Sequence, residues 1–514
     1  MIRLQLILLL VILLASCTTR MQRTDFPERY KSAKEYNAKL KKIIAGDSAL
    51  AFDADIRLDT EEEKANLVLK NLQSSMLNYY DSIHFFPPAK HFFKSKTHIY
   101  STPLFALLKQ MPKGAVQHLH PGAGVSFHWI VDRAVKEKDC YVFWEESNAV
   151  NLKGELAFFK PGKAPKGFYS TLELNKTISN FRSQLYQLLI FDDSMMADST
   201  DIWKEFEFRF KRIEAFNSYQ PVTEDFYASI FDSLAADGVQ HVELRTHLSD
   251  NLYDLEHPAG YFTGDSVIKY IQHAVQRTRA NREPNFSCAL IYTNVRFYPV
   301  EVIKADLVRA FGYRKKYPEL VTAYDLVAHE DAGYSTRFYL DAWLSRDSLA
   351  KTFGIDLPFC FHDGESDWQH VSNVYDAVML KTRRLGHGFN LSFFPAAEAE
   401  IIRSETCVEV SPLSNQILGY ITDLRMHPAH AWIKHGMQIS ISPDDPSIFG
   451  YTGVTPDYWS IFLAWELDLR SLKQLAINSI RYSFLAENKK KAALENWNKK
   501  WIDFVQVINQ YGSN

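Results

Sequence analysis

The chain has little cysteine, no hydrophobic run long enough to span a bilayer and no excess of charge of one sign. Five cysteines occur among 514 residues without a CxxC pair, which argues against a disulfide scaffold and against a cysteine-type zinc site. Lys and Arg number 58 against 61 Asp and Glu, so no basic field favours a nucleic-acid partner. Hydrophobic residues make up 46%, far from a disordered composition. We expect a globular protein in which His and carboxylates hold any metal.

The apolar run nearest the N terminus covers residues 6–15 and follows a single positive charge at Arg3. A membrane-spanning helix needs ~20 apolar residues, so this run predicts a signal peptide over residues 1–16. The run ends in Leu-Ala-Ser-Cys at Cys17, which resembles the bacterial lipobox, where the cysteine is lipidated. We expect export to the bacterial cell envelope, periplasmic or outer-surface, with membrane contact only through a lipid anchor at Cys17. An ordinary secretory signal is the alternative.

Three segments follow the signal peptide. Residues 17–110 are helical in pattern, with a capping-box signature at Thr60-Glu61-Glu62-Glu63. Residues 111–470 contain eight short β-rich runs separated by stretches long enough for a helix. Residues 471–514 predict amphipathic C-terminal helices. The eight runs lie near Ala115–His120, Val239–Arg245, Ser287–Thr293, Thr322–Ala328, Leu357–His362, Arg384–His387, Cys407–Ser411 and Met437–Ser442.

Eight β-runs with helical spacers predict an α/β fold, a closed parallel (β/α)8 barrel of the TIM type. The gap between the first and second runs is oversized, so we expect an insertion at about residues 140–184 after the first strand. An N-terminal helical segment and C-terminal helices complete the predicted architecture. Active sites of such barrels lie at the C-terminal ends of the strands, which makes the position of a residue along its run evidence of function.

Histidines and an aspartate fall at the C-terminal ends of four runs. His118 and His120 are two residues apart on one run, so their side chains point to the same side. His362 and His387 end the fifth and sixth runs, and Asp444 follows the eighth. These nitrogen and oxygen ligands suit Zn²⁺ and leave a position for water. Zinc lowers the pKa of its bound water to about 7, which supplies a hydroxide nucleophile for hydrolysis.

Glu365 lies three residues after His362 and is the best candidate for proton transfer. A lone HxH pair or a lone Glu would by default be structural, and only their shared place at strand ends favours a site. His427, His430 and His435 lie in a helix-like stretch before the eighth run, and we do not count them as ligands.

Several motifs, in this order, resemble the adenosine deaminase family. They are Met111-Pro112-Lys113-Gly114 with His118-Leu119-His120, His362-Asp363-Gly364-Glu365, Arg384-Leu385-Gly386-His387-Gly388, Ser411-Pro412-Leu413-Ser414-Asn415 and Ser442-Pro443-Asp444-Asp445-Pro446. Other stretches resemble the secreted branch of the family, the adenosine deaminase-related growth factors: Phe191-Asp192-Asp193-Ser194, His241-Val242-Glu243-Leu244-Arg245, Tyr324-Asp325-Leu326-Val327 and His329-Glu330-Asp331. The resemblance covers nearly the whole chain after the signal peptide.

The resemblance implies one Zn²⁺ per chain, held by His118, His120, His362 and Asp444. Glu365 and His387 would be the catalytic residues: Glu365 protonates purine N1 while zinc hydroxide attacks C6, and His387 orients and helps to deprotonate the water. Three residues would bind substrate. Asp445 would hydrogen-bond purine N7, the backbone N–H of Ala328 would face N3, and Trp203 would help to close the pocket; a core tryptophan is the alternative for Trp203.

Two residues depart from the family pattern. Ala328 replaces a glycine, and we expect its methyl group to crowd the base. Asp363 replaces an alanine; if it faces the site, its charge raises the pKa of Glu365, and the alternative is a side chain that points to solvent.

We therefore predict an exported, zinc-dependent purine nucleoside deaminase that converts adenosine or 2′-deoxyadenosine to the inosine form and ammonia. Two alternatives stay open: a mononuclear amidohydrolase acting on another purine or amide, and a non-catalytic nucleoside-binding or signalling protein. The fourth run lacks the lysine that commonly bridges two metals in this superfamily, which favours one metal. By resemblance, the N-terminal helices suggest a homodimer.

Overall fold

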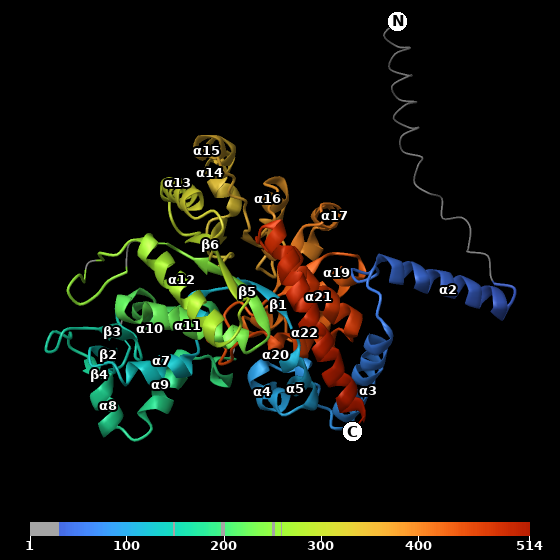
Figure 1. Cartoon of the computed structure of the whole chain (residues 1–514), viewed down its shortest axis with the longest axis horizontal. Coiled ribbons are helices and arrows are strands. Elements are labelled where there is room, and N and C mark those ends of the chain that lie inside the picture. Colours follow the sequence, from blue (N-terminus) through green and yellow to red (C-terminus); the bar gives the residue numbers. More distant parts are fainter. Residues whose placement is uncertain (1–29, 148–149, 197–200, 249–251, 259, 514) are drawn as a thin grey trace, which may run out of the picture. The chain divides into compact units, whose positions relative to one another are not determined.

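The computed structural model describes residues 30–513 except 148–149, 197–200, 249–251 and 259 (Figure 1). The predicted signal peptide and Cys17 lie outside the described residues. The chain divides into two units, residues 1–50 and 51–514. Of the first, the structure describes mainly helix α2 (Ala33–Leu50). The second contains all the strands and the remaining described helices.

Eight short parallel strands form a closed barrel at the centre of the second unit, as predicted. They are β1 (Gly114–Leu119), β5 (Val239–Thr246), β6 (Ser287–Val295), β7 (Val321–Val327), β8 (His362–Asp363), β9 (Arg384–His387), β10 (Cys407–Val410) and β11 (Ile439–Ile441). The strands pair as two sheets, β1-β5-β6-β7 and β11-β10-β9-β8. Parallel bridges between Leu119 and Asp444 and between Tyr324 and Phe359 join the two sheets. The strands are buried along almost their whole length, as expected for a parallel sheet covered by helices.

Helices follow most of the barrel strands and cover the outside of the barrel. They are α11 (Gln220–Ala235), α12 (Gly264–Asn281), α13 (Val300–Lys316), α14 (Leu340–Leu344), α15 (Arg346–Phe353), α16 (Val374–Met379), α17 (Pro395–Arg403), α18 (Pro412–Ile417), α19 (Pro428–Lys434) and α20 (Thr455–Ala464). This alternation of strand and helix places every C-terminal strand end at one mouth of the barrel.

The helices before and after the barrel pack against each other. These are α3 (Thr60–Ser82), α4 (Phe92–Tyr100), α5 (Pro103–Gln110), α21 (Leu469–Arg481) and α22 (Glu487–Ser513). Helix α22 contacts α3, and Trp501 Nε1 donates a hydrogen bond to Glu62 Oε1 at 2.7 Å. The expected capping box was misplaced by one residue, because Asp59 rather than Thr60 is the N-cap and pairs reciprocally with Glu62.

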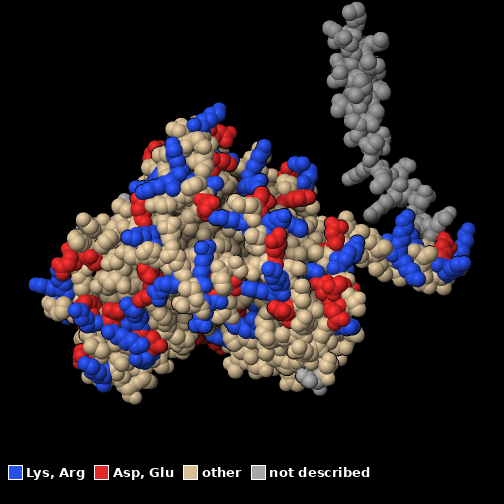
Figure 2. Space-filling view, in the orientation of Figure 1, with Lys and Arg blue, Asp and Glu red and all other residues tan. Residues whose placement is uncertain are grey.

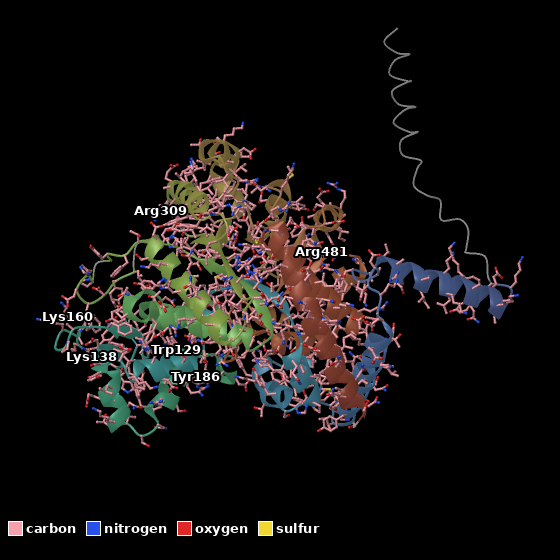
Figure 3. The ribbon with its side chains drawn as sticks, in the orientation of Figure 1. Trp129, Lys138, Lys160, Tyr186, Arg309 and Arg481 are labelled. Atoms are coloured by element: carbon pink, nitrogen blue, oxygen red, sulfur yellow. The ribbon has the colours of Figure 1, made fainter. Side chains whose placement is uncertain are left out.

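The insertion after β1 is a small antiparallel sheet with helices beside it. Its elements and flanking helices are α6 (Pro121–Gly124), α7 (Phe127–Ala134), β2 (Cys140–Phe143), β3 (Leu156–Phe158), β4 (Phe168–Ser170), α8 (Thr171–Thr177) and α9 (Phe181–Leu189). The sheet order is β3-β2-β4. Figure 3 labels Lys138, Lys160 and Tyr186 in this part of the molecule. The insertion extends past the predicted residue 184 to the end of α9, and α10 (Ile202–Ser218) then leads back to the barrel.

The surface carries both signs of charge in close alternation. On the face seen in Figure 2, Lys and Arg side chains are interspersed with Asp and Glu over the second unit. This matches the near balance of 58 basic and 61 acidic residues. Among the described residues, no helix combines the length and the hydropathy needed to cross a membrane.

Candidate active site

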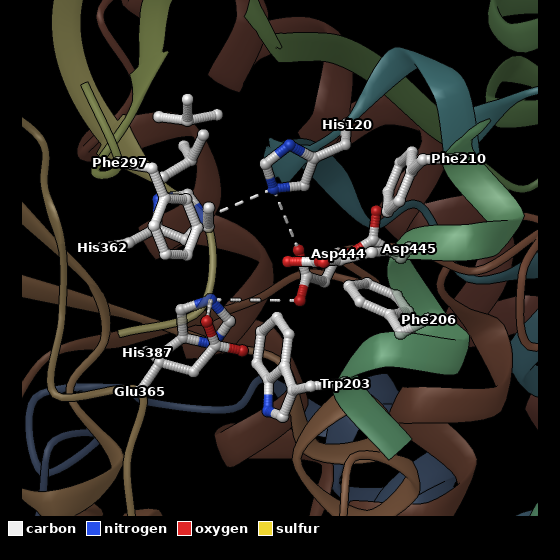
Figure 4. A pocket seen from close by; sticks show the side chains of 14 residues that line it. His120, Trp203, Phe206, Phe210, Phe297, His362, Glu365, His387, Asp444 and Asp445 are labelled. Carbon is white, nitrogen blue, oxygen red and sulfur yellow. Dashed lines mark hydrogen bonds and ion pairs between the residues drawn. The ribbon is translucent and has the colours of Figure 1, made fainter. Parts of the chain in front are cut away.

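Three histidines and one aspartate meet at the C-terminal mouth of the barrel; Figure 4 shows His120, His362 and Asp444 of this group. The nitrogen and oxygen atoms that His118, His120, His362 and Asp444 offer lie within 4.8 Å of one another. His118 Nε2 is 3.2 Å and His120 Nε2 is 3.3 Å from Asp444 Oδ1. His120 Nε2 also lies 3.3 Å from His362 Nε2. The structure thus brings together all four residues predicted to bind a metal.

Two buried carboxylates orient the histidine rings from behind. His118 Nδ1 hydrogen-bonds Glu409 Oε2 at 2.9 Å, and His362 Nδ1 hydrogen-bonds Asp325 Oδ2 at 2.7 Å. A proton on each Nδ1 leaves the Nε2 lone pair pointing at the centre of the cluster. Burial lowers the pKa of His362 to about 3, which keeps its ring neutral and able to ligate.

Unpartnered atoms at the centre of the cluster fit a metal ion. Among the described residues, His118 Nε2 and Asp444 Oδ1 are buried without a hydrogen bond. Buried polar atoms almost always have a hydrogen-bond partner. Two such atoms that face each other without one are therefore positioned to bind a further group, such as a metal ion. Three imidazole nitrogens and one carboxylate oxygen are a donor set that suits Zn²⁺.

Glu365 and His387 lie beside this cluster. Glu365 Oε2 is 3.6 Å from His387 Nε2, and His387 Nε2 is 3.9 Å from Asp444 Oδ2. Burial raises the pKa of Glu365 well above its usual value, and the nearby charges of Asp444 and Glu330 raise it further. Burial also holds the pKa of His387 well below its ordinary value. These shifts favour the protonated form of Glu365 and the neutral form of His387.

Glu330 holds the backbone of the loop that carries Glu365. Its carboxylate accepts hydrogen bonds from the backbone N–H of Gly364 at 3.0 Å and of Glu365 at 2.6 Å. Gly364 has φ +86°, and a Cβ there would lie 2.7 Å from Val374 Cγ1. This loop conformation therefore requires glycine.

Both expectations for Asp363 were wrong. The side chain faces neither the site nor solvent, because it is fully buried on the far side of the strand. Its Oδ1 accepts a hydrogen bond from Thr336 Oγ1 at 2.5 Å and lies 3.5 Å from Arg296 Nη2. The direction of the Asp363 side chain is determined by Thr336 and Arg296. Both are distant from Asp363 in the sequence, so no local sequence pattern reveals them.

The cluster opens onto a cavity of about 310 Å³ that the three residues predicted to bind substrate also line: Trp203, Ala328 and Asp445. Trp203 comes from α10, where its ring stacks on His329 with centroids 4.3 Å apart and its Nε1 donates to Tyr420 Oη at 3.1 Å. Phe206, Glu207 and Phe210 of the same helix also line the cavity. The sequence analysis missed these three, although they follow Trp203 at helical spacing.

Sequence reasoning also missed a charged network inside the barrel. Arg245 and Arg384 both bond Glu409, with Arg384 Nε 2.5 Å from Glu409 Oε1. Arg245 Nε lies 3.2 Å from Asp325 Oδ2. The network thus links the carboxylates behind His118 and His362. The available signal was at least one charged residue within each of four strand runs.

Ala328 is strained where it meets the cavity. Its φ is +83°, in the left-handed region that disfavours a β-carbon. We expect Ala328→Gly to raise the free energy of unfolding by about 0.5–1 kcal/mol and to lower KM for a purine nucleoside, because the methyl group leaves the cavity. Urea unfolding and steady-state kinetics test this. Ala350→Gly, within helix α15, is the control and should instead lower the free energy of unfolding by about 1 kcal/mol. Equal decreases for the two variants would contradict the strain at Ala328.

His427, His430 and His435 stay outside the cluster, as expected. His427 is buried and caps α19: the backbone N–H of Ala429 donates to its Nδ1 at 3.1 Å, and its Nε2 hydrogen-bonds Asn415 Oδ1 at 3.1 Å. Burial, together with the charge of His430, lowers the pKa of His427 to about 3 from 6.5.

This pKa predicts acid sensitivity. Between pH 6.5 and 3 the unfolded chain binds a proton at His427 that the folded chain does not, so stability present above pH 6.5 is lost as the pH falls. The loss should reach roughly 3 kcal/mol at pH 4.5. His427→Gln should flatten the pH dependence of urea unfolding relative to the parent protein. A parallel pair of curves would show that His427 titrates normally.

Comparison with known proteins identifies the family. Residues 194–500 match the adenosine deaminase family model, and residues 8–108 match the adenosine/AMP deaminase N-terminal model. Adenosine deaminase 2 of Sus scrofa is 34% identical over 94% of this chain and 96% of its own length. The human protein of that name is 32% identical over 88% of this chain and 89% of its own.

Solved structures share the fold at low sequence identity. The apo N6-methyl-AMP deaminase of Arabidopsis thaliana superposes with a TM-score of 0.54 at 14% identity, covering 77% of this chain and 98% of that one. An amidohydrolase of Burkholderia ambifaria with bound Zn gives 0.51 at 14% identity, covering 79% and 95%. With the barrel, the family models and the full-length relatives in agreement, the chain belongs to the adenosine deaminase family.

Proposed function

We propose that the protein is a zinc-dependent purine nucleoside deaminase that hydrolyses adenosine or 2′-deoxyadenosine to the inosine form and ammonia. The observation that carries this proposal is the junction of the four-residue donor cluster with Glu365 and His387 at one cavity. The family membership and the names of the relatives support the substrate class.

One Zn²⁺ would be held by His118, His120, His362 and Asp444, and the zinc bound in the amidohydrolase neighbour supports that metal. When bound, zinc supplies Lewis-acid activation of a water molecule near neutral pH. Glu409 and Asp325 keep the histidine rings in the ligating tautomer.

The side chains around the cavity would carry the proton transfers. Glu365 donates a proton to purine N1 as water adds at C6, and His387 takes a proton from that water. Burial and the charge of Asp444 raise the pKa of Asp445 well above its usual value, which favours a protonated carboxyl that would donate to N7, an acceptor. The backbone N–H of Ala328 faces N3. His387 then returns its proton to the C6 amino group, which leaves as ammonia, and Glu365 regains a proton from the C6 hydroxyl as the 6-oxo group forms.

The test is the fall in adenosine absorbance on conversion to inosine, measured on protein that begins after Cys17. Adenosine, 2′-deoxyadenosine, adenine and AMP are compared with and without a zinc chelator. Chelator-sensitive turnover of a nucleoside is the expected result. If only adenine or AMP is turned over, the proposed nucleoside substrate is wrong and the substrate is another purine. Zinc-loaded protein that turns over none of the four compounds would overturn the deaminase proposal.

We also propose export with lipid attachment at Cys17, on the basis of the Leu-Ala-Ser-Cys sequence at residues 14–17. Cys17→Ala should move the protein from the membrane fraction to the soluble fraction, because the thiol that would carry the lipid is gone. Immunoblots of the two fractions measure this, and retention of the variant in membranes would contradict the lipobox. A homodimer stays a prediction.

A further inference from the structure

Helix α10 has two faces with different surroundings. Trp203, Phe206, Glu207 and Phe210 lie on one stripe at spacings of three, four and seven residues and line the cavity. Figure 4 shows Trp203, Phe206 and Phe210 projecting from this helix toward the His and Asp cluster. Helix α10 is therefore one wall of the site, but it is not one of the barrel helices that follow a strand.

The buried arginines of α10 bond to the insertion. Arg212 Nε donates to the backbone oxygen of Lys153 at 2.9 Å, and its Nη1 donates to the backbone oxygen of Leu188 at 2.9 Å. Arg212 is only 8% exposed. Both of its described hydrogen bonds therefore end on the insertion, one before β3 and the other at the end of α9.

The second arginine of α10, Arg209, forms an ion pair with Glu205 of its own helix and also contacts the residues directly after α9. Arg209 Nε donates to the backbone oxygen of Ile190 at 3.4 Å, and its guanidinium lies 4.9 Å from the centre of the Phe191 ring. The last carbonyls of a helix lack intrahelical partners and carry the negative end of its dipole. Arg209 and Arg212 thus satisfy oxygens at and just after the C terminus of α9, where a cation is favoured.

Further packing joins the same two parts. Phe158 of β3 stacks on Tyr219, at the end of α10, with ring centroids 3.8 Å apart. Gly154 has φ +92°, and a Cβ there would lie 3.0 Å from Leu188 Cβ and 3.5 Å from Arg212 Cδ. Close approach of the insertion backbone at this point brings the Lys153 carbonyl within reach of Arg212.

From these contacts we infer that the insertion after β1 is a positioning element of the active site, which acts through Arg212 and Arg209 to fix α10 as the wall of the substrate cavity. The inference rests on the proposed function for the identity of the substrate, but not for the position of the helix. Arg212 is a positioning residue, since its charge is directed away from the cavity and into the insertion. A misplacement of about 1 Å at a binding wall can cost on the order of 10²-fold in rate.

The experiment compares Arg212→Met and Arg212→Lys with Arg314→Met in the full zinc-loaded protein. Arg314 is a matched control because its Nε and Nη1 likewise donate to backbone oxygens, of Asp356 at 3.1 Å and Val321 at 3.0 Å. It lies on α13, none of whose described residues lines the cavity. Arg314 Nη1 also donates to the backbone oxygen of Pro318, so Arg314→Met removes three such hydrogen bonds and Arg212→Met removes two. The control therefore loses at least as many hydrogen bonds as the test variant.

We expect Arg212→Met to raise KM for adenosine by about tenfold or more, with a smaller change in kcat and an unchanged zinc content. Arg212→Lys should be intermediate, because an ammonium group replaces a fork that reaches two carbonyls at once. Amide hydrogen exchange of residues 202–218 should become faster in Arg212→Met and stay unchanged in Arg314→Met. KM should be unchanged in Arg314→Met.

An Arg212→Met variant that loses stability with unchanged KM and unchanged exchange in α10 would overturn the inference. If the parent protein deaminates nothing, the proposed function fails by itself, and the exchange of α10 still decides whether the insertion holds the helix. If Arg212→Met does not fold, Arg212→Lys and Gly154→Ala carry the same comparison, each with raised KM and faster exchange expected.

Discussion

Replacing Glu365 with Gln is expected to lower kcat by a factor of ~10² to 10⁴ while the protein keeps one zinc ion. The amide has the size of the carboxylic acid but cannot give up a proton to purine N1. Glu365 is not one of the four proposed ligands, although it belongs with His387 and Asp444 to a second group that could hold a metal. Because those four ligands are untouched, we expect the metal to stay. Its raised pKa, caused by burial and then by Asp444 and Glu330, shows that the folded protein stabilises the acid form.

The measurement combines steady-state kinetics with zinc content by atomic absorption. Glu400→Gln makes the same chemical change in a surface pair with Arg403 and should leave both quantities unchanged. A rate near that of the parent protein would remove Glu365 from the proton transfer, and a loss of zinc in parallel with activity would assign it to the metal site instead.

Replacing Glu409 with Gln is expected to lower the free energy of unfolding by about 3–5 kcal/mol, the usual cost of removing one partner from a buried ion pair. Glu409 is fully buried and bonds Arg245, Arg384 and His118. The neutral amide would take from each buried arginine one of its two described carboxylate partners, leaving Arg384 with Glu243 and Arg245 with Asp325. Zinc affinity should also fall about 10- to 100-fold, since the His118 ring loses its carboxylate partner.

Urea unfolding of the zinc-free protein measures the loss of stability alone. Competition with a zinc chelator of known affinity measures the loss of zinc affinity. Glu400→Gln is again the control, with an expected change within about 0.5 kcal/mol because its ion pair is on the surface. A loss below about 1 kcal/mol for Glu409→Gln would show that water or a rearranged side chain replaces the carboxylate.

The barrel could be predicted from sequence because each strand is a short apolar run that ends in a polar residue. The least regular was the fifth, where only His362 and Asp363 form a strand. The residues before them pair with β7 only through isolated backbone hydrogen bonds, such as Tyr324 N to Pro358 O at 2.9 Å. The hydrophobic pattern of the sequence cannot distinguish such bonds from a continuous series of strand hydrogen bonds. The capping box was misplaced because Asp59 and Thr60 are both good N-cap residues with a Glu three positions later.

The active site, like the barrel, has residues that the sequence could predict and residues that it could not. Strand-end positions revealed His118, His120, His362 and Asp444, since the barrel fixes where strand ends meet. The network behind them escaped prediction because a charged residue inside a strand run has no partner within its own run: Glu409 pairs with Arg384 on the neighbouring strand and with Arg245 across the barrel. Only the closed structure shows which of these charges neutralise one another.

The bridge between Leu119 and Asp444 joins the first and last strands, and we expect it to form late during folding. The backbone N–H of His120 donates to the backbone oxygen of Asp444 at 3.3 Å, so two metal ligands form the seam of the barrel. Contacts this distant in sequence form late, because a long loop must close first. A chain interrupted before β11 has its three histidines but not its aspartate. If the proposed metal binds these four residues, we expect its tight capture only after the entire barrel has been synthesised and closed.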